Sequence, residues 1–258
     1  MNSTECSSWD HLNCKAPLPP NHQRSSHWYK AKISVGTDPQ GEKKILKAYP
    51  SPGFPIRYYF LALANREYRM LKRVEGLPFT PMDVGRDRRE GNLISYQYID
   101  GRSIKAVSKS DTIPKDFFPK LYSAVLDLHQ QGTAHLDLGN SGNILVTRNG
   151  NPVIIDFGSA FSLERLPGYL QRWMRKKDLL GMLKLWRRFD RETMPAFLLE
   201  YYRRNYKKNI YTPRRFYKAT KRHLLKRLAR RSASNADDAA ILRIVGLFFG
   251  LMVLISLW

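Results

Sequence analysis

Residues 134–158 read AHLDLGNSGNILVTRNGNPVIIDFG, and this stretch decides the fold of the chain. Two short apolar runs stand on either side of Asn149-Gly150, a dipeptide that favours a two-residue hairpin turn. We therefore expect a strand on each side of this turn. Antiparallel pairing brings the start of the first strand beside the end of the second. Asn143 and Asp156 are thus predicted to lie at the same end of the hairpin.

The polar residues around this hairpin are of the types that phosphoryl transfer from ATP requires. The reaction needs a carboxylate beside the attacking hydroxyl and oxygen ligands for Mg²⁺ near the phosphates. Asp137 is the candidate for the first role, and Asn143 and Asp156 are the candidates for the metal. Asn140 is an alternative metal ligand, because the step from Asp137 to Asn143 is one residue longer than usual. The order His-x-Asp, then Asn, then Asp-Phe-Gly resembles the catalytic core of the protein-kinase-like superfamily.

This resemblance implies two further residues. Kinase-like enzymes hold the phosphates with a Lys on an early strand, and a Glu on the following helix holds that Lys. Lys47 lies in a predicted strand at 43–49 and is the candidate Lys. Glu67 lies at 61–71, where apolar residues recur at helical spacing, and is its candidate partner.

The segment between these residues and the hairpin also fits the resemblance. Residues 92–101 alternate between apolar and polar and then turn, as a last small-lobe strand running into an adenine-binding hinge would do. Gln97 to Ile99 are the hinge candidates. Residues 117–131 are predicted to form an amphipathic helix that ends at Gly132, a favourable C-cap residue.

Two features depart from the usual kinase pattern. No Gly-rich loop precedes the Lys strand, and the corresponding region at 19–26 contains no glycine. Phosphates covered by this region would have to be held by side chains such as Ser25, Ser26 or Arg24. Leu136 stands where kinases that are switched by a phosphorylated activation loop carry Arg, so this form of control is not expected.

The length of the chain selects a branch of the superfamily. Its 258 residues suit one two-lobed domain, but only about 80 residues separate Gly158 from an apolar tail, and they contain no Ala-Pro-Glu. Over residues 28–190 the pattern most resembles bacterial lipopolysaccharide-core kinases and RIO-like atypical kinases. The resemblance implies an α+β, bilobal protein-kinase-like domain at 28–235, with a small antiparallel-sheet N-lobe at about 28–98 and a reduced helical C-lobe at about 102–235. It also implies that Asp178 steadies the catalytic loop.

The charge distribution indicates an anionic partner. The formal net charge is +22, and between Arg165 and Arg231 there are 22 basic and 4 acidic residues. Such a field attracts anionic lipid headgroups, phosphorylated glycolipid or nucleic acid. Aromatic residues such as Trp173 and Trp186 interleave with the charges, and they suit either a binding face or a helical core.

The C-terminal tail favours a membrane among these partners. Residues 239–258 carry one charge, Arg243, and as a helix they would be roughly 30 Å long, about one bilayer core. We expect a C-terminal anchor helix, with a half-inserted segment or a buried core helix as alternatives. The preceding basic stretch places the catalytic domain at the cytoplasmic face of the membrane. Residues 1–27 lack the apolar core of a signal peptide and are expected to be flexible, and their two cysteines suit a reducing compartment.

Together these features predict an ATP- and Mg²⁺-dependent kinase. The resemblance implies a sugar hydroxyl of a membrane glycolipid, the lipopolysaccharide core, as acceptor. A RIO-like protein serine/threonine kinase is the rival enzyme, and a pseudokinase scaffold or basic binding module is the rival without activity. Retention of Lys47, Asp137, Asn143 and Asp156 disfavours a scaffold, and nucleic acid is the less favoured partner.

Overall fold

The computed structural model describes residues 30–38, 40–87, 91–110 and 113–206. The chain divides into two compact units between Met194 and Pro195. The expected N-terminal segment 1–27, the region at 19–26 and the expected anchor helix 239–258 all lie outside the described residues, as do both ends of the expected domain 28–235. Among the described residues, no helix combines the length and the apolar character needed to cross a bilayer.

The first unit begins with a small antiparallel sheet, as the sequence predicts. Its strands run in the order β1-β2-β4-β3. Their bounds are β1 Lys32–Thr37, β2 Lys43–Ala48, β3 Gly85–Arg86 and β4 Leu93–Gln97. The turn between β1 and β2 is closed by Asp38, whose Oδ1 accepts the N–H groups of Gln40 and Glu42. Gly41 follows with φ of +82°, a conformation that favours glycine.

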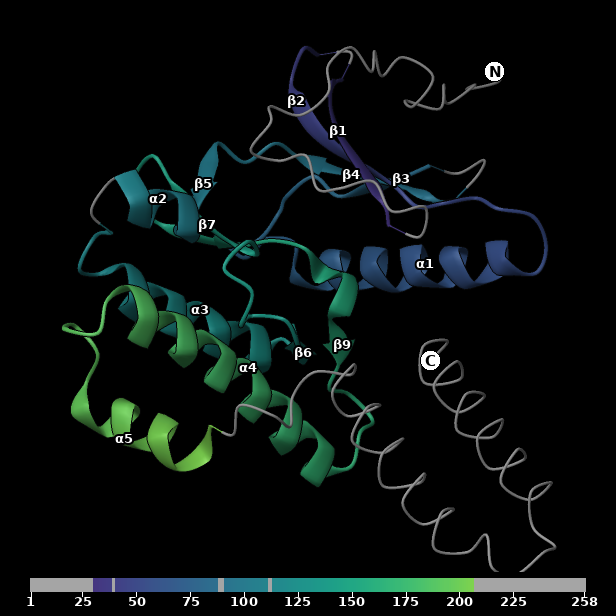
Figure 1. Ribbon diagram of the computed structural model, residues 1–258. Helices are drawn as coiled ribbons and strands as arrows, with labels where there is room; N and C mark the ends of the chain where they lie inside the picture. Colours follow the sequence, from purple (N-terminus) through teal and green to yellow (C-terminus); the bar gives the residue numbers. More distant parts are fainter. Residues whose placement is uncertain (1–29, 39, 88–90, 111–112, 207–258) are drawn as a thin grey trace, which may run out of the picture. The chain divides into compact units, whose positions relative to one another are not determined.

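One long helix, α1 (Ile56–Val74), lies beside this sheet (Figure 1). It buries one stripe of side chains: Phe60, Ala64, Glu67, Met70, Leu71 and Val74. The helix begins five residues before the expected segment 61–71. Tyr58 and Tyr59 in its first turn are exposed, so this turn lacks the apolar spacing that marks a helix in a sequence.

The predicted hairpin forms the next layer. Strands β7 (Ile144–Thr147) and β8 (Pro152–Ile154) are antiparallel, and Gly150 between them has φ of +74°. Strand β5 (Gly101–Ser103) joins β7, which gives a sheet of order β5-β7-β8. A further antiparallel pair joins β6 (Thr133–Ala134) to β9 (Phe161–Ser162). A short 3₁₀ turn, η1 (Phe157–Ser159), lies between β8 and β9 in the chain. The expectation that Asn143 and Asp156 flank one end of the hairpin is confirmed.

Helices complete the first unit: α2 (Ile104–Ser110), α3 (Phe117–Gln130) and α4 (Gly168–Phe189). Helix α3 ends close to the predicted position, and Gly132 beyond it has φ of +69°. Helices α3 and α4 pack side by side (Figure 1). Phe118 stacks on Trp186 with ring centroids 5.5 Å apart, and both side chains are buried. Trp186 is therefore a core residue, whereas Trp173 on the same helix is exposed.

In the second unit the described part is helix α5 (Ala196–Asn205), which is followed by Tyr206. Tyr202 and Tyr206 stack on one another, with ring centroids 4.6 Å apart. The sequence left open whether these aromatics belong to a core or to a binding face. Tyr202 is buried, as expected of a core position.

The packing of α3 against α4 gives a stability prediction. Trp186→Ala removes a fully packed ring and leaves a cavity, so we expect the free energy of unfolding to fall by about 3–5 kcal/mol. Urea denaturation measures this change. Tyr169→Ala is the control, because Tyr169 lies on the same helix with 64% of its surface exposed, and it is expected to change stability by less than about 0.5 kcal/mol. Equal losses in the two variants would contradict the described packing.

Candidate functional site

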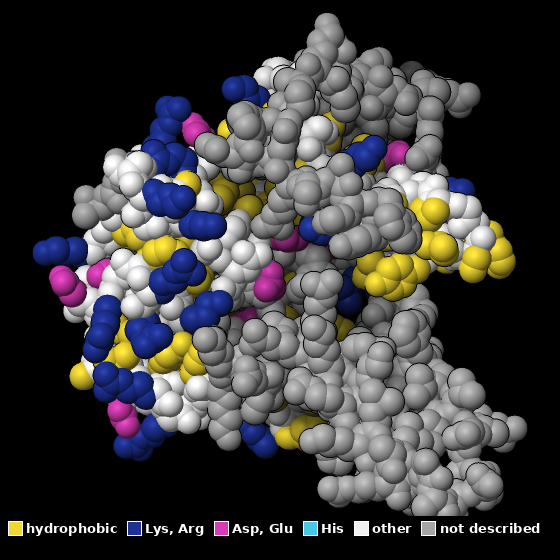
Figure 2. Space-filling model, viewed as in Figure 1, with side chains coloured by type: hydrophobic (Ala, Val, Ile, Leu, Met, Phe, Trp, Pro, Cys, Tyr) yellow, Lys and Arg dark blue, Asp and Glu magenta, His cyan; other side chains and the backbone are white. Residues whose placement is uncertain are grey.

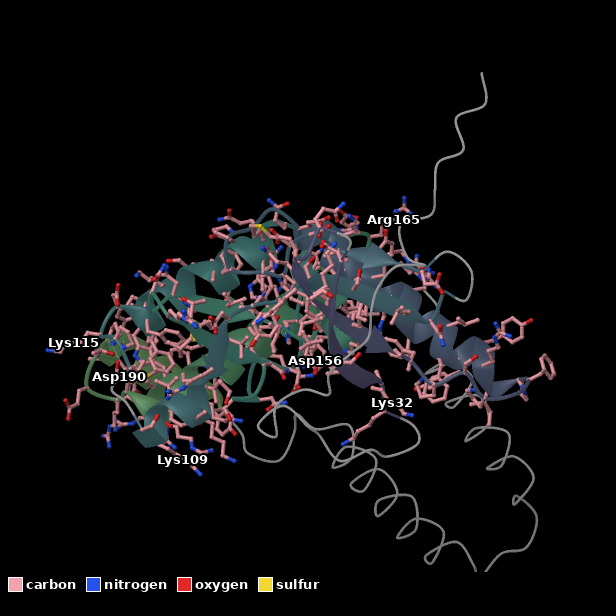
Figure 3. All side chains as sticks on the ribbon, turned by 90° about the horizontal axis from the view of Figure 1, so that it is seen from above. Lys32, Lys109, Lys115, Asp156, Arg165 and Asp190 are labelled. Atoms are coloured by element: carbon pink, nitrogen blue, oxygen red, sulfur yellow. The ribbon has the colours of Figure 1, made fainter. Side chains whose placement is uncertain are left out.

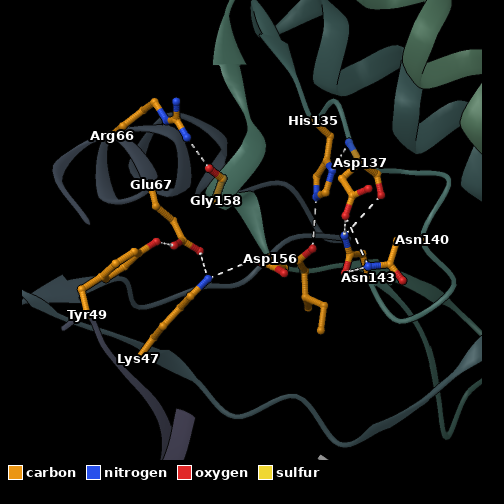
Figure 4. Close-up of polar contacts among 11 residues, drawn as sticks. Lys47, Tyr49, Arg66, Glu67, His135, Asp137, Asn140, Asn143, Asp156 and Gly158 are labelled. Atoms are coloured by element: carbon orange, nitrogen blue, oxygen red, sulfur yellow. Dashed lines mark hydrogen bonds and ion pairs between the residues drawn. The ribbon is translucent and has the colours of Figure 1, made fainter. Parts of the chain in front are cut away.

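The ammonium group of Lys47 is the centre of the candidate site (Figure 4). Its Nζ lies 2.8 Å from Oε1 of Glu67 and 2.9 Å from Oδ1 of Asp156. Strand β2 supplies the Lys, α1 supplies Glu67, and the end of the hairpin supplies Asp156. Glu67 is 1% exposed, and its charge is matched by Lys47, which is also buried. The structure thus brings together three of the residues that the sequence singled out.

The electrostatics of this cluster favour the charged form of the Lys. Burial opposes the charge of Lys47, but the Glu67 and Asp156 carboxylates outweigh it and raise the pKa of Lys47 well above its ordinary value. The hydroxyl of Tyr49 donates a hydrogen bond to Oε2 of Glu67. Burial is the main cause that raises the pKa of the Tyr49 hydroxyl, which keeps it protonated as a donor. Both Glu67 oxygens are therefore held, and the cation remains available on its third side.

Asp156 is held in a special backbone conformation. Its φ of 65° and ψ of 68° lie in the left-handed region, which is uncommon outside glycine. The turn that follows is fastened on two sides. Phe157 packs edge-on against His135 with ring centroids 5.0 Å apart, and the Gly158 carbonyl accepts a hydrogen bond from Arg66 on α1 at 2.6 Å. This conformation aims the Asp156 carboxylate at Lys47 rather than along the strand.

The loop that carries Asp137 is held from below by α4. Asp178 accepts the backbone N–H of His135 at 2.7 Å and that of Leu136 at 2.6 Å. Leu136 has φ of 63°, another left-handed residue beside a functional position. Asp178 is 1% exposed, and His129 also contacts it, at 3.2 Å. The predicted support of this loop by Asp178 is present.

Helix α4 can reach the loop because it has a glycine at the point of contact. A Cβ added to Gly181 would lie 2.8 Å from the backbone nitrogen of Gly139, closer than any real side chain is found. The carboxylate of Asp178 could not span a wider gap to the two N–H groups. The absence of a side chain at Gly181 therefore allows the short distance between the backbone of α4 and the backbone of the loop.

Asp137 itself is oriented by two amides. Asn143 donates from Nδ2 to Oδ2 of Asp137 at 2.9 Å, and Asn140 donates to the same oxygen at 3.3 Å. Asn140 also donates to Oδ1 of Asn143 at 3.2 Å. The preferred and the alternative metal ligand are thus neighbours in one network. Among the described residues no hydrogen bond involves Oδ1 of Asp137.

The donor types at this place fit Mg²⁺. A carboxylate from Asp156 and an amide oxygen from Asn143 are hard ligands, which Mg²⁺ combines with phosphate oxygens and water. Within the described ranges, no cluster of three or more His, Cys, Asp or Glu side chains could hold a metal ion alone. A Mg²⁺ at this site would therefore depend on the phosphates of a nucleotide for part of its coordination.

A cleft of about 580 Å³ opens beside Lys47 and Asp156. Ile33 and Ile45 of the first sheet line it together with Leu145 of the second sheet and with Ile155. Lys47 and Asp156 also line the cleft, and so do the basic side chains of Arg102, Lys105 and Lys109. A planar aromatic base suits the apolar side chains, and polar groups attached to that base would reach the charges.

The two hinge candidates differ in their positions. Ile99 lines the cleft, together with Tyr96 and Tyr98. Gln97 is exposed and is not among the residues that line it, and its N–H donates to the Met82 carbonyl at 2.8 Å. The N–H of Tyr98 is also used, by the carbonyl of Lys43 at 3.0 Å. Ile99 thus lies at the cleft as expected of a hinge residue, and contact of Gln97 with a nucleotide stays a prediction.

The sequence did not single out Tyr49 or Arg66. Tyr49 stands two residues after Lys47, and side chains two apart on a strand share a face. This spacing was a usable signal for a partner of Glu67. Arg66 offered no such signal, because its partner is a backbone carbonyl that lies 92 residues away.

Comparison with known proteins agrees with this geometry at the level of the fold. No family model and no curated protein sequence matches the chain. A solved structure of the Rio2 kinase from Chaetomium thermophilum is similar to it, with 18% identity, a TM-score of 0.52, and coverage of 78% of this chain and 64% of that one. An ADP/Mg²⁺-phosphoaspartate complex of this kinase gives 17% identity, a TM-score of 0.50, and coverage of 74% and 60%.

The chain therefore spans less than two thirds of the solved structures it matches. The similarity shows the protein-kinase-like fold, which the sequence predicted. It shows no relation to lipopolysaccharide-core kinases in particular.

The contact between Gly181 and the loop that carries Asp137 gives a second prediction. In an isolated helix Gly→Ala is stabilising by about 1 kcal/mol. Gly181→Ala is expected to do the opposite and destabilise by about 1–3 kcal/mol, because the methyl group meets backbone atoms of the loop. Thermal unfolding measures the sign. Gly53→Ala is the matched control, since a Cβ there meets nothing within 4 Å. A Gly181→Ala variant as stable as the original chain would contradict the described approach.

Proposed function

We propose that this protein is an ATP-dependent phosphotransferase that phosphorylates a sugar hydroxyl of a membrane glycolipid, of the lipopolysaccharide-core type, at the cytoplasmic face of the membrane. The observation that carries the enzymatic part is the ion-paired cluster of Lys47, Glu67 and Asp156 beside the cleft. A binding scaffold has no need to bury a Lys and a Glu together, because desolvation of two charges is unfavourable.

The nucleotide would lie in the cleft with its base against the apolar side chains and its phosphates towards Lys47. The ammonium group of Lys47 would neutralise phosphate charge, and Glu67 would keep the Lys extended towards it. Asp156 and Asn143 would hold Mg²⁺, which shields the charge on the phosphates during transfer. The ADP/Mg²⁺ complex of the Rio2 kinase supports the choice of this cofactor pair.

Asp137 would receive the proton of the acceptor hydroxyl. Its Oδ2 is fixed by Asn143 and Asn140, so Oδ1 is the oxygen left for the hydroxyl. The carboxylate would accept the proton while the hydroxyl oxygen attacks the terminal phosphorus and the bond to the bridging oxygen of ADP breaks. Asp178 would keep the loop in place by accepting its two N–H groups.

The basic surface supports an anionic, membrane-bound acceptor. Figure 2 shows Lys and Arg side chains gathered over the face that carries α2 and α4. Lys105 and Lys109 on α2 and Arg172 on α4 are exposed. Figure 3 shows Lys32, Lys109 and Lys115 projecting outward around the central Asp156. Each Lys or Arg near an anionic surface adds about 1 kcal/mol of attraction. In this proposal an anchor helix at 239–258 tethers the kinase-like domain at 28–235 to the membrane that carries the acceptor.

A RIO-like protein kinase is the second candidate, and the structural similarity to the Rio2 kinase favours it. That kinase was solved as a phosphoaspartate complex. By analogy, a carboxylate of this chain could itself take the phosphoryl group from ATP and release ADP. The acceptor would then be Asp, Ser or Thr of a protein instead of a sugar.

The third prediction separates these candidates by following the terminal phosphate of ATP. The purified full chain is incubated with γ-labelled ATP, Mg²⁺ and bacterial core glycolipid, and label is measured in lipid and protein fractions. We expect label in the glycolipid. Asp137→Asn should reduce it by about 10²–10⁴-fold, the usual contribution of a general base. Arg175→Gln is the control, because Arg175 is exposed and outside the site.

The distribution of label decides the outcome. Label on Ser or Thr of an added protein supports the RIO-like reading, and so does a hydroxylamine-sensitive acyl phosphate on the chain itself. Transfer that is undiminished in Asp137→Asn, or no transfer by the wild-type chain to glycolipid or to protein, refutes the proposed mechanism.

A further inference from the structure

Helix α4 presents two lysines to the loop that carries Asp137. Lys177 and Lys184 are seven residues apart, so they lie on one stripe of the helix and about 10 Å apart along its axis. Gly181, which touches the loop, lies between them on the same side. Both lysines are close enough to Asp137 for its charge to act on their pKa values.

Lys184 sits directly against the catalytic loop. Its Nζ donates a short hydrogen bond to the Gly139 carbonyl. A Cβ added to Gly139 would lie 3.1 Å from the same Nζ, so the ammonium group fills the space beside this glycine. Burial lowers the pKa of Lys184, although Asp137 acts in the opposite direction. A carbonyl satisfies one of the three ammonium donors and leaves the positive charge unneutralised.

Lys177 is held on the other side of Gly181. Its Nζ lies 5.8 Å from the centroid of the Trp173 ring, which is 46% exposed. Burial lowers the pKa of Lys177, although Asp178 and Asp137 oppose the shift. Asp178 is turned to the backbone N–H groups of the loop. In the part of the chain that the structure describes, neither Lys177 nor Lys184 forms an ion pair with a carboxylate.

Partial burial of two cations that form no ion pair with a carboxylate is energetically unfavourable, and a bound anion would reduce this cost. The phosphates of ATP have their own cation in Lys47, which reaches the cleft from β2. Near α4, Asp137 supplies one negative charge that acts on both lysines, so the two cations leave room for a further anion, which the other reactant could supply. The exposed ring of Trp173 offers a flat apolar surface beside it, of the kind that a sugar ring covers.

We propose that Lys177 and Lys184 bind a phosphate or carboxylate group of the acceptor, beside the hydroxyl that Asp137 receives, with the acceptor ring against Trp173. This inference rests on the proposed function, because it takes Asp137 as the group that meets the hydroxyl. It restricts the acceptor to anionic compounds. A neutral sugar would leave Asp137 and Asp178 as the described carboxylates that act on these two cations.

The fourth prediction tests this site by equilibrium binding, without any transfer of phosphate. The full chain in nonionic detergent is saturated with Mg²⁺ and a non-hydrolysable ATP analogue, and glucose 6-phosphate is titrated with glucose as the neutral control. We expect the phosphorylated sugar to bind at least tenfold more tightly. Lys177→Gln and Lys184→Gln should each weaken it about tenfold, the loss typical of one charge-assisted hydrogen bond.

Matched variants separate a built site from the general positive field. Arg175→Gln removes one charge from an exposed position on the same helix and should leave the affinity for glucose 6-phosphate unchanged. Lys177→Arg keeps the charge and the contact with Trp173, so it should retain most of the affinity. An equal loss in Arg175→Gln would overturn the proposal, and so would wild-type binding of glucose as tightly as glucose 6-phosphate.

The nucleotide is titrated first, so that two failures can be told apart. Absence of Mg²⁺-dependent binding of the ATP analogue to the wild-type chain would refute the proposed function itself. Normal nucleotide binding without preference for the phosphorylated sugar would refute only the acceptor site. Loss of nucleotide affinity in both lysine variants, with the sugar phosphate unaffected, would assign these cations to ATP and overturn the inference.

Discussion

One buried ammonium group determines how the described part of the protein is assembled. Lys47 pairs with Glu67, 20 positions away, and with Asp156, 109 positions away, and so joins a strand, a helix and the end of a hairpin. Charges this deeply buried are tolerated only when they are paired and hydrogen-bonded. The small sheet, α1 and the hairpin must therefore be positioned correctly together, and the same condition creates the site beside the cleft.

A second set of contacts fixes the position of the loop that carries Asp137. Asp178 and Gly181 on α4 hold the backbone around Asp137, the first by accepting hydrogen bonds and the second by having no side chain. His135 connects this loop to the segment that carries Asp156. Its ring packs on Phe157 and contacts the Ile155 carbonyl at 3.1 Å. A shift of α1 or of α4 would therefore change the distance and the orientation between the side chains of Asp137 and Asp156. This coupling suits chemistry that requires a base and a metal ligand in fixed positions.

The sequence reveals those features whose chemistry is local or whose spacing is regular. The hairpin followed from Asn149-Gly150, and Lys47, Glu67 and Asp156 followed from motif order, although only the fold could show that they meet. Contact of Gln97 with a nucleotide stays a prediction, and the pairing of its N–H with the Met82 carbonyl is a contact that no pattern in the sequence indicated. The contact of Lys184 with Gly139 joins residues 45 positions apart on a helix of basic residues. Nothing in such a sequence distinguishes one lysine from its neighbours, so this site required the structure.

The central claim is that the Lys47 cluster is the phosphate end of a nucleotide site. Calorimetric titration of the full chain with ATP, with and without Mg²⁺, tests it most directly when Asp156→Asn is measured in parallel. We expect the wild-type chain to bind ATP at least about tenfold more tightly with Mg²⁺, a gain of about 1.4 kcal/mol or more, and the variant to show no such gain. Equal affinity of both chains for ATP, whether or not Mg²⁺ is present, would contradict the account.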